Sequence, residues 1–204
     1  MSSREQILAA AKQNTLKRYN KPDYTELEKQ ALTFDNKIEK FCEMMKAVGG
    51  QVAVLEEGQN INDVIKAHFP DAKRIATNLK EVTCLGQPQA ITCATFHPDD
   101  VEKPGELNGT DLAILQGHLG VCENAAVWVK QDMEQRTIFF ISEAIVLIVD
   151  RNTLVNNMHE AYKKVETGDM GYATFISGPS KTADIEQALV MGAHGARVAL
   201  AILV

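Results

Sequence analysis

The chain has 204 residues, of which 45% are hydrophobic and 24% are charged, and its formal net charge is −6. This composition is typical of a globular protein with a sizeable core, and an acidic chain without a basic cluster is not expected to bind nucleic acid. The longest apolar run, residues 144–149, is too short to cross a bilayer, and the first residues lack the pattern of a secretory signal. We therefore expect a cytoplasmic protein with no membrane insertion.

The N-terminal part of the chain is predicted to be a helical arm. Residues 2–17 can form an amphipathic helix. Asp35 then opens a clearer helix, in which apolar residues recur at helical spacing until Gly49 ends it. The predicted division is an arm, residues 1–33, followed by an α/β domain, residues 34–204.

Strands and helices alternate along the predicted domain. The predicted strands are residues 51–55, 74–77, 111–115, 125–130, 144–149, 172–176 and 197–204. The predicted helices are residues 61–69, 154–165 and 183–191, and prolines weaken the pattern between residues 80 and 109. Such alternation is typical of parallel βαβ units. The sequence therefore predicts an open, mostly parallel sheet with helices on both faces.

The segment after the predicted strand 172–176, ISGPSKTADIE, concentrates small and polar residues. A loop between a strand and a helix presents backbone N–H groups at the helix N-terminus, where a phosphate or carboxylate can bind. The candidate residues for a small anionic ligand are Ser177, Gly178, Ser180, Lys181 and Thr182.

The alternative is a capped helix start that binds nothing. Asp184, itself a further candidate contact, and Glu186 would lie in the first turn of the predicted helix and would partly oppose an anion.

A second candidate site is the turn GHLGVCEN, residues 117–124. His118 and Glu123 lie between two predicted strands and could form a catalytic acid/base pair or bind a metal ion. The alternative is that both are ordinary turn residues. Cys122 could act as a nucleophile only beside an activating positive charge, which a sequence does not reveal.

A third polar turn is GAHG, residues 192–195. Gly192 suits the position after a helix, and His194 then stands at the start of the last strand. In a regular parallel sheet this is the amino side, away from the ligand-binding loops, so a structural role for His194 is favoured. The four cysteines contain no C-x-x-C pair, so we expect neither a metal site nor a cofactor in this chain.

The segments FISGPSKTADIE and LVMGAHG, within residues 175–195, closely resemble the C-terminal signature of the LUD-domain family. Weaker similarity extends over residues 35–204. The resemblance implies the fold shared by ribose-5-phosphate isomerase, glucosamine-6-phosphate deaminase and CoA transferases, the NagB/RpiA/CoA-transferase-like fold. It also implies a role in oxidising L-lactate to pyruvate together with two iron–sulfur partner proteins.

Two positions depart from the family pattern. Many members have a T-G-T-type turn where this chain has Glu123-Asn124-Ala125-Ala126, and Ala196 replaces the proline that usually follows H-G. Because the first difference lies in a candidate pocket, the resemblance leaves the substrate open.

Three functions therefore stay open. The chain could be a subunit of a lactate-oxidising system that acts with iron–sulfur subunits. It could instead be a stand-alone enzyme on a phosphosugar- or acyl-CoA-type substrate, with Glu123 as base or nucleophile. It could also be a module that binds a small carboxylate, and a homo-oligomer is compatible with each of these functions.

Overall fold

The computed structural model describes residues 2–13, 22–23, 25–165, 168, 171–185 and 188–204. The chain divides into two compact units, Met1–Ala31 and Leu32–Val204. The first unit contains the helices α1 (Ser3–Gln13) and α2 (Thr25–Lys29), and no residue of α1 is buried. The helix predicted over residues 2–17 is present up to Gln13, and its last residues lie outside the described part. The second unit holds the sheets and every candidate site residue.

The centre of the second unit is a five-stranded parallel sheet in the order β1-β13-β8-β5-β2. Its strands are β1 (Gln51–Val54), β2 (Ile75–Thr77), β5 (Leu112–Gly117), β8 (Ala144–Val149) and β13 (Val198–Leu203). Every residue of β8 is buried, as its unbroken apolar and β-branched sequence predicts for a strand inside a parallel sheet. The predicted mostly parallel sheet is confirmed.

A second, four-stranded sheet has the order β10-β7-β6-β9. Its strands are β6 (Leu119–Val121), β7 (Val127–Lys130), β9 (Leu154–Val155) and β10 (Ala173–Ile176). β7 runs antiparallel to β6 and β10, whereas β9 is parallel to β6. The two sheets approach closely where β5 passes into β6, because a Cβ atom at Gly117 would lie only 2.6 Å from Val127 Cγ1 and 2.7 Å from Val149 Cγ2. A side chain at this position would push the sheets apart.

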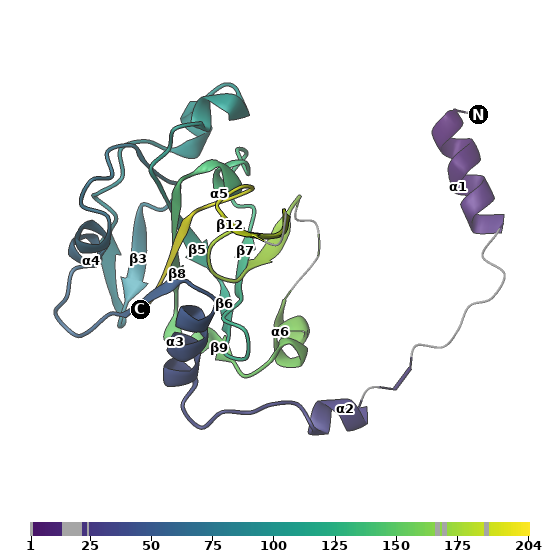
Figure 1. Ribbon diagram of the computed structural model, residues 1–204, viewed down its shortest axis with the longest axis horizontal. Helices are drawn as coiled ribbons and strands as arrows, with labels where there is room; N and C mark the ends of the chain where they lie inside the picture. Colours follow the sequence, from purple (N-terminus) through teal and green to yellow (C-terminus); the bar gives the residue numbers. More distant parts are fainter. Residues whose placement is uncertain (1, 14–21, 24, 166–167, 169–170, 186–187) are drawn as a thin grey trace. The chain divides into compact units, whose positions relative to one another are not determined.

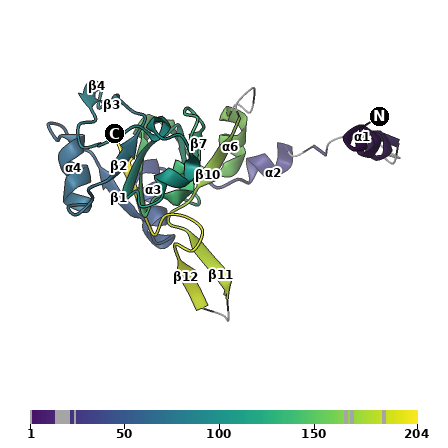
Figure 2. The same ribbon diagram turned by 90° about the horizontal axis from the view of Figure 1, so that it is seen from above.

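Helices and a hairpin complete the layers (Figures 1 and 2). On one face of the parallel sheet lie α4 (Ile61–His68) and the hairpin of β3 (Glu81–Cys84) and β4 (Gln87–Ala90). Ile65 of α4 and Val82 of β3 belong to one hydrophobic core on this face. On the other face lie α3 (Lys37–Ala47), α5 (Ile138–Ile141) and the second sheet. Phe41 and Met45 of α3 are buried in the hydrophobic core that these elements share. α6 (Met158–Lys164) contributes Ala161 to a third core on the outer side of the second sheet. Helices do cover both faces, but one face is shared with a sheet that the sequence did not predict.

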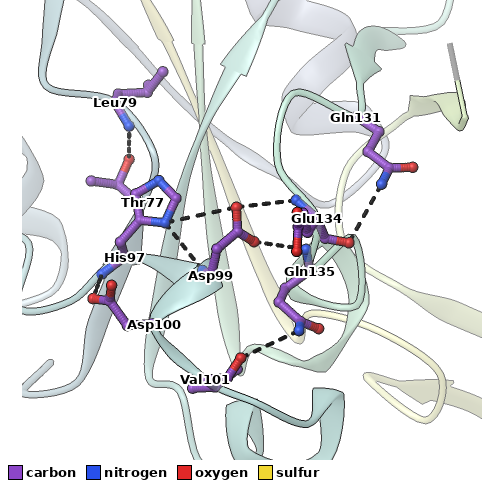
Figure 3. A network of polar contacts seen from close by, with 9 residues as sticks. All are labelled: Thr77, Leu79, His97, Asp99, Asp100, Val101, Gln131, Glu134 and Gln135. Atoms are coloured by element: carbon purple, nitrogen blue, oxygen red, sulfur yellow. Dashed lines mark hydrogen bonds and ion pairs between the residues drawn. The ribbon is translucent and has the colours of Figure 1, made fainter.

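The proline-containing segment, residues 80–109, forms the β3–β4 hairpin and two 3₁₀ helices, η1 (Pro98–Asp100) and η2 (Pro104–Leu107). Asp99 ties this segment to the loop before α5, because its carboxylate accepts the backbone N–H groups of Glu134 at 3.1 Å and Gln135 at 2.8 Å (Figure 3). His97 Nδ1 in turn accepts the N–H of Asp99. Side chains therefore fix this irregular segment where strand pairing does not.

The helix predicted over residues 183–191 is wrong. β11 (Lys181–Ile185) and β12 (Ala188–Met191) form an antiparallel hairpin that projects from the rest of the second unit (Figure 2). Lys181 pairs with Met191, and the Gly192 N–H donates to the carbonyl of Ser180 at 3.0 Å, which extends the pairing. The apolar run of β12 is so short that its period cannot distinguish a strand from a helix.

The helix predicted over residues 154–165 begins only at Met158. The residues before it form the 3₁₀ helix η3 (Arg151–Thr153) and the strand β9. Asn157 is the N-cap of α6, and its side-chain oxygen accepts the N–H of Glu160 at 3.0 Å.

Candidate functional site

Five of the sequence-predicted residues line one cavity of about 300 Å³, the signature cavity: Ser177, Gly178, Ser180, Lys181 and His194. Ser177, Gly178 and Ser180 lie between β10 and β11, and Lys181 is the first residue of β11; we call residues 177–181 the signature loop. Apolar walls are added by Phe139, Phe140, Ile145 and Ala196. The structure therefore brings most of the predicted anion-binding residues to one place.

The signature cavity lies at the amino edge of the parallel sheet, which corrects the expected position at the carboxyl edge. Ile145 is the second residue of β8, and Ala196 precedes β13. β10 was expected in the parallel sheet, whereas it pairs with β7 in the second sheet. His194, expected to lie apart from the loop, consequently lines the same cavity.

The signature loop packs against the C-terminal end of α3. Gly178 has a φ of +70°, and a Cβ atom there would lie 2.8 Å from Val48 Cγ2 and 3.0 Å from the Val48 carbonyl oxygen. Lys181 Nζ donates to that same carbonyl. A positive charge is favourable at the C-terminus of a helix, so Lys181 has a structural function here.

Several of the groups expected to bind an anion are engaged or lie elsewhere. The Ser180 N–H donates to the Ala196 carbonyl at 2.8 Å, and the residues that follow it directly form the strand β11, not a helix. Thr182 lies in β11, paired with Val190, and does not line the signature cavity. Asp184 also lies in β11, with its side chain outside the described part of the chain. The predicted cradle of backbone N–H groups at a helix start is therefore wrong, and the Ser180 hydroxyl and the exposed His194 imidazole stay as polar groups at the cavity.

Glu123 is a half-buried residue in the turn between β6 and β7. Its carboxylate accepts the N–H of Met158 at 2.9 Å, at the first residue of α6, and its own N–H donates to the Asn156 carbonyl at 3.0 Å. The next residue is tied to the signature loop, because Ser177 Oγ donates to the Asn124 carbonyl at 2.6 Å. The Glu123 turn thus adjoins the residues of the signature cavity.

His118 lies at the other end of β6 from Glu123 and directly follows β5, at the carboxyl edge of the parallel sheet. The backbone N–H of His118 donates to the Trp128 carbonyl at 2.8 Å. The two residues flank a strand and have different neighbours, so the structure does not bring them together as an acid/base pair. His118 instead lines a separate cavity of about 400 Å³, the His118 cavity, with Lys130 and Lys164.

The thiol of Cys122 is unsuited to nucleophilic catalysis. Cys122 is fully buried, and burial raises the pKa of its thiol to about 11 although the positive charge of Lys37 lowers it. Its Sγ donates to the Lys37 carbonyl at 3.3 Å. Over the described ranges of the chain, no three His, Cys, Asp or Glu side chains are grouped so that they could hold a metal ion.

The residues that surround His118 were not predicted from the sequence. Lys130 ends β7, two residues after Trp128, so both project from the same side of that strand. Asn152 and Thr153 come from η3 and Lys164 from the end of α6. Alternation along the strand could have linked Trp128 with Lys130, but no local pattern indicates that α6 ends beside them.

Known proteins share parts of this sequence. A family model described as LUD domain matches residues 38–204. A protein named lactate utilization protein C from Oceanobacillus iheyensis is 33% identical over 92 residues, which is 42% of this chain and 40% of that protein. A protein of the same name from Geobacillus thermodenitrificans is 33% identical over 101 residues, 46% of this chain and 42% of that protein. The matches thus span less than half the length of these relatives.

One solved structure is similar in fold. The crystal structure of a DUF162 family protein from Deinococcus radiodurans matches 84% of this chain and 98% of its own chain with a TM-score of 0.62 and 14% sequence identity. At this identity the likeness concerns the fold alone. Within the described ranges, no helix combines the length and the apolar character that spanning a bilayer requires.

Proposed function

This chain belongs to the LUD domain family, and from that we propose that it acts in lactate utilisation, as a subunit that works with iron–sulfur partner proteins when L-lactate is oxidised to pyruvate. The observation that carries the proposal is the family match over residues 38–204, which takes in nearly all of the second unit, Leu32–Val204. Relatives that are 33% identical over 92 and 101 residues are named lactate utilization protein C, which supports the same pathway.

The proposal gives this chain a binding function in the reaction. Oxidation of L-lactate to pyruvate removes two electrons and two protons from the substrate, and we assign the electrons to clusters held by the partner proteins. The signature cavity, at about 300 Å³, is large enough for a small carboxylate. The Ser180 hydroxyl and the His194 imidazole would contact the ligand, and Phe139 and Phe140 would exclude water from it.

Deleting the gene in the native host tests the proposal. We expect the deletion strain to lose growth on L-lactate and to keep growth on pyruvate, and the wild-type gene to restore growth on L-lactate. A tagged chain should co-purify with proteins that contain iron and acid-labile sulfide. Unchanged growth of the deletion strain on L-lactate would refute the role in lactate utilisation.

Variants of two exposed histidines separate the cavity from the rest of the fold. His194→Ala should fail to restore growth on L-lactate, because it removes a polar group from the signature cavity. His159→Ala is the matched control, since His159 is also exposed but lies on α6. Equal growth of both variants would remove His194 from the proposed site.

A second candidate function, a stand-alone enzyme on a phosphosugar- or acyl-CoA-type substrate, is favoured by the bond from Ser177 to the Asn124 carbonyl. That bond holds the Glu123 turn beside the signature loop, and the Glu123 carboxylate, which accepts the Met158 N–H, could act as a general base or as a nucleophile. Glu123→Gln should then reduce turnover by the purified chain about 100-fold or more, the usual scale for losing a general base. Absence of turnover by the purified wild-type chain on such substrates would exclude this alternative.

A further inference from the structure

The His118 cavity is built from elements of both sheets. His118 follows the end of β5, Leu119 and Trp128 come from β6 and β7, and Lys164 comes from the last turn of α6. It lies beyond the carboxyl ends of β5 and β8, since η3, which supplies Asn152 and Thr153, follows β8. In open parallel sheets, ligands bind at this edge. The signature cavity, in contrast, opens at the amino edge.

Two ammonium groups give the His118 cavity a positive character. Lys130 and Lys164 both line it, and within the described part of the chain neither forms an ion pair within 4 Å of a carboxylate. The acidic groups that act on this region are Asp132, which favours the protonated form of His118, and Glu160, which lies one helical turn before Lys164. Neither of these carboxylates lines the cavity.

The surroundings of His118 favour the neutral form of its imidazole. Burial lowers the pKa of His118, the positive charge of Lys130 lowers it further, and Asp132 only partly offsets both effects. The Nε2 atom is buried and has no hydrogen-bond partner in the described part of the chain. A neutral ring can donate or accept a hydrogen bond beside the two lysines without adding a third positive charge.

Part of the cavity wall is apolar, besides the polar Asn152 and Thr153. Leu119 and Trp128 are almost fully buried, and Val165 lies next to them in the lining. The Trp128 ring packs against Phe175 with ring centroids 4.7 Å apart, which holds the indole in place. The cavity therefore combines two lysine side chains with an apolar portion of its wall.

We propose that the His118 cavity binds a small organic dianion, whose charged group lies between Lys130 and Lys164 and whose apolar part rests on Leu119 and Trp128. Two cations at one site favour a doubly charged group, such as a phosphomonoester, over a single carboxylate, because each ammonium can make a charge-assisted hydrogen bond. This site is separate from the signature cavity and does not depend on the proposed role in lactate utilisation.

The test uses the fluorescence of Trp128, which is the single tryptophan of the sequence and lines the cavity itself. The probes for the full chain are phenyl phosphate, inorganic phosphate and benzoate, each titrated to millimolar concentrations. We expect a saturable change with phenyl phosphate and weaker binding of the other two, because inorganic phosphate lacks the apolar part and benzoate carries one charge.

Lysine variants locate the binding. Lys130→Ala and Lys164→Ala should each raise the Kd for phenyl phosphate about 10-fold or more, the scale of one lost hydrogen bond to a charged group. Lys103→Ala is the matched control, because it removes the same charge from an exposed position beside η2, outside the cavity lining, and should leave the Kd unchanged. No saturable change with phenyl phosphate, or the same Kd in all three variants, would overturn the proposal. Tighter binding of benzoate than of phenyl phosphate would overturn the assignment to a dianion.

Discussion

Replacing Gly178 by alanine measures how closely the signature loop packs on the end of α3. An L-residue held at the positive φ of Gly178, +70°, costs about 1–2 kcal/mol. The new Cβ atom would also lie 2.8 Å from Val48 Cγ2 and 3.0 Å from the Val48 carbonyl oxygen, and overpacking of this kind costs about 1–3 kcal/mol. We therefore expect Gly178→Ala to lower the free energy of unfolding by about 2–5 kcal/mol in urea denaturation.

Gly58 provides the matched control for this experiment. Its φ is +80°, yet a Cβ atom there would meet nothing within 4 Å, so Gly58→Ala should show only the backbone cost of about 1–2 kcal/mol. Adding Val48→Ala to Gly178→Ala removes one of the two clashes and should recover about 0.5–3 kcal/mol in a double-mutant cycle. If Gly178→Ala costs no more than Gly58→Ala, or if the cycle shows no coupling with Val48, the packing of the loop on α3 is refuted.

Three further predictions concern the rest of the second unit. Leu85 and Gly86 form the two-residue turn between β3 and β4 with φ values of +49° and +80°, and the Leu85 side chain is exposed. Because asparagine tolerates a positive φ better than leucine, Leu85→Asn should raise the free energy of unfolding by about 0.5–1 kcal/mol. A loss of stability would contradict this turn. Burial raises the pKa of Cys122 to about 11, so iodoacetamide at about pH 8 should label this thiol about 100-fold more slowly in the native chain than in the urea-unfolded chain. Mass spectrometry measures the two labelling rates. Comparable rates would mean that the thiol is accessible and ionised in the native chain. The Asp111 carboxylate accepts the backbone N–H groups of residues 73 and 74 at 2.8 Å, and these hydrogen bonds lower its pKa. The carboxylate therefore stabilises the fold above about pH 4, and this stabilisation is lost as the pH falls through the folded-state pKa. Asp111→Asn should accordingly lower the Tm at neutral pH, and its difference from wild type should shrink toward about pH 2, whereas a constant difference would exclude the charge as the cause.

The sequence predicted the parts of the fold whose signals are local. The helical period from Ile38 to Val48 predicts α3, and the continuous apolar run of β8 predicts a strand in the middle of the sheet, because in each case one periodicity extends over enough residues. The second sheet was not predicted, since its strands are short and nothing within β10 indicates that its neighbour is β7. The hairpin of β11 and β12 was mistaken for a helix for the same reason: its pairing, not its composition, decides its structure.

The same distinction between local and long-range signals holds for the candidate site. Ser177, Gly178 and Ser180 were identified from their own residue types, and they do line one cavity. Their surroundings depend on the partner strand of β10, so the loop was expected at the wrong edge of the parallel sheet and apart from His194. Lys164 joins His118 only because α6 packs on the outer side of the second sheet, a contact between segments far apart in the chain.

The position of β13 has a consequence for the order in which the nascent chain can fold. β13 lies between β1 and β8 and is the only strand paired with β1 in the described sheet. A ribosome releases β1, β2, β5 and β8 before it releases β13, so β1 must wait without a neighbour while β8 presents an open edge. Unpaired strand edges of this kind promote aggregation during synthesis. The yield of this protein should therefore fall when translation pauses ahead of residue 198 or when chaperones that shield nascent chains are lost. The fall should be larger than for a protein in which each new strand is added at the edge of the sheet.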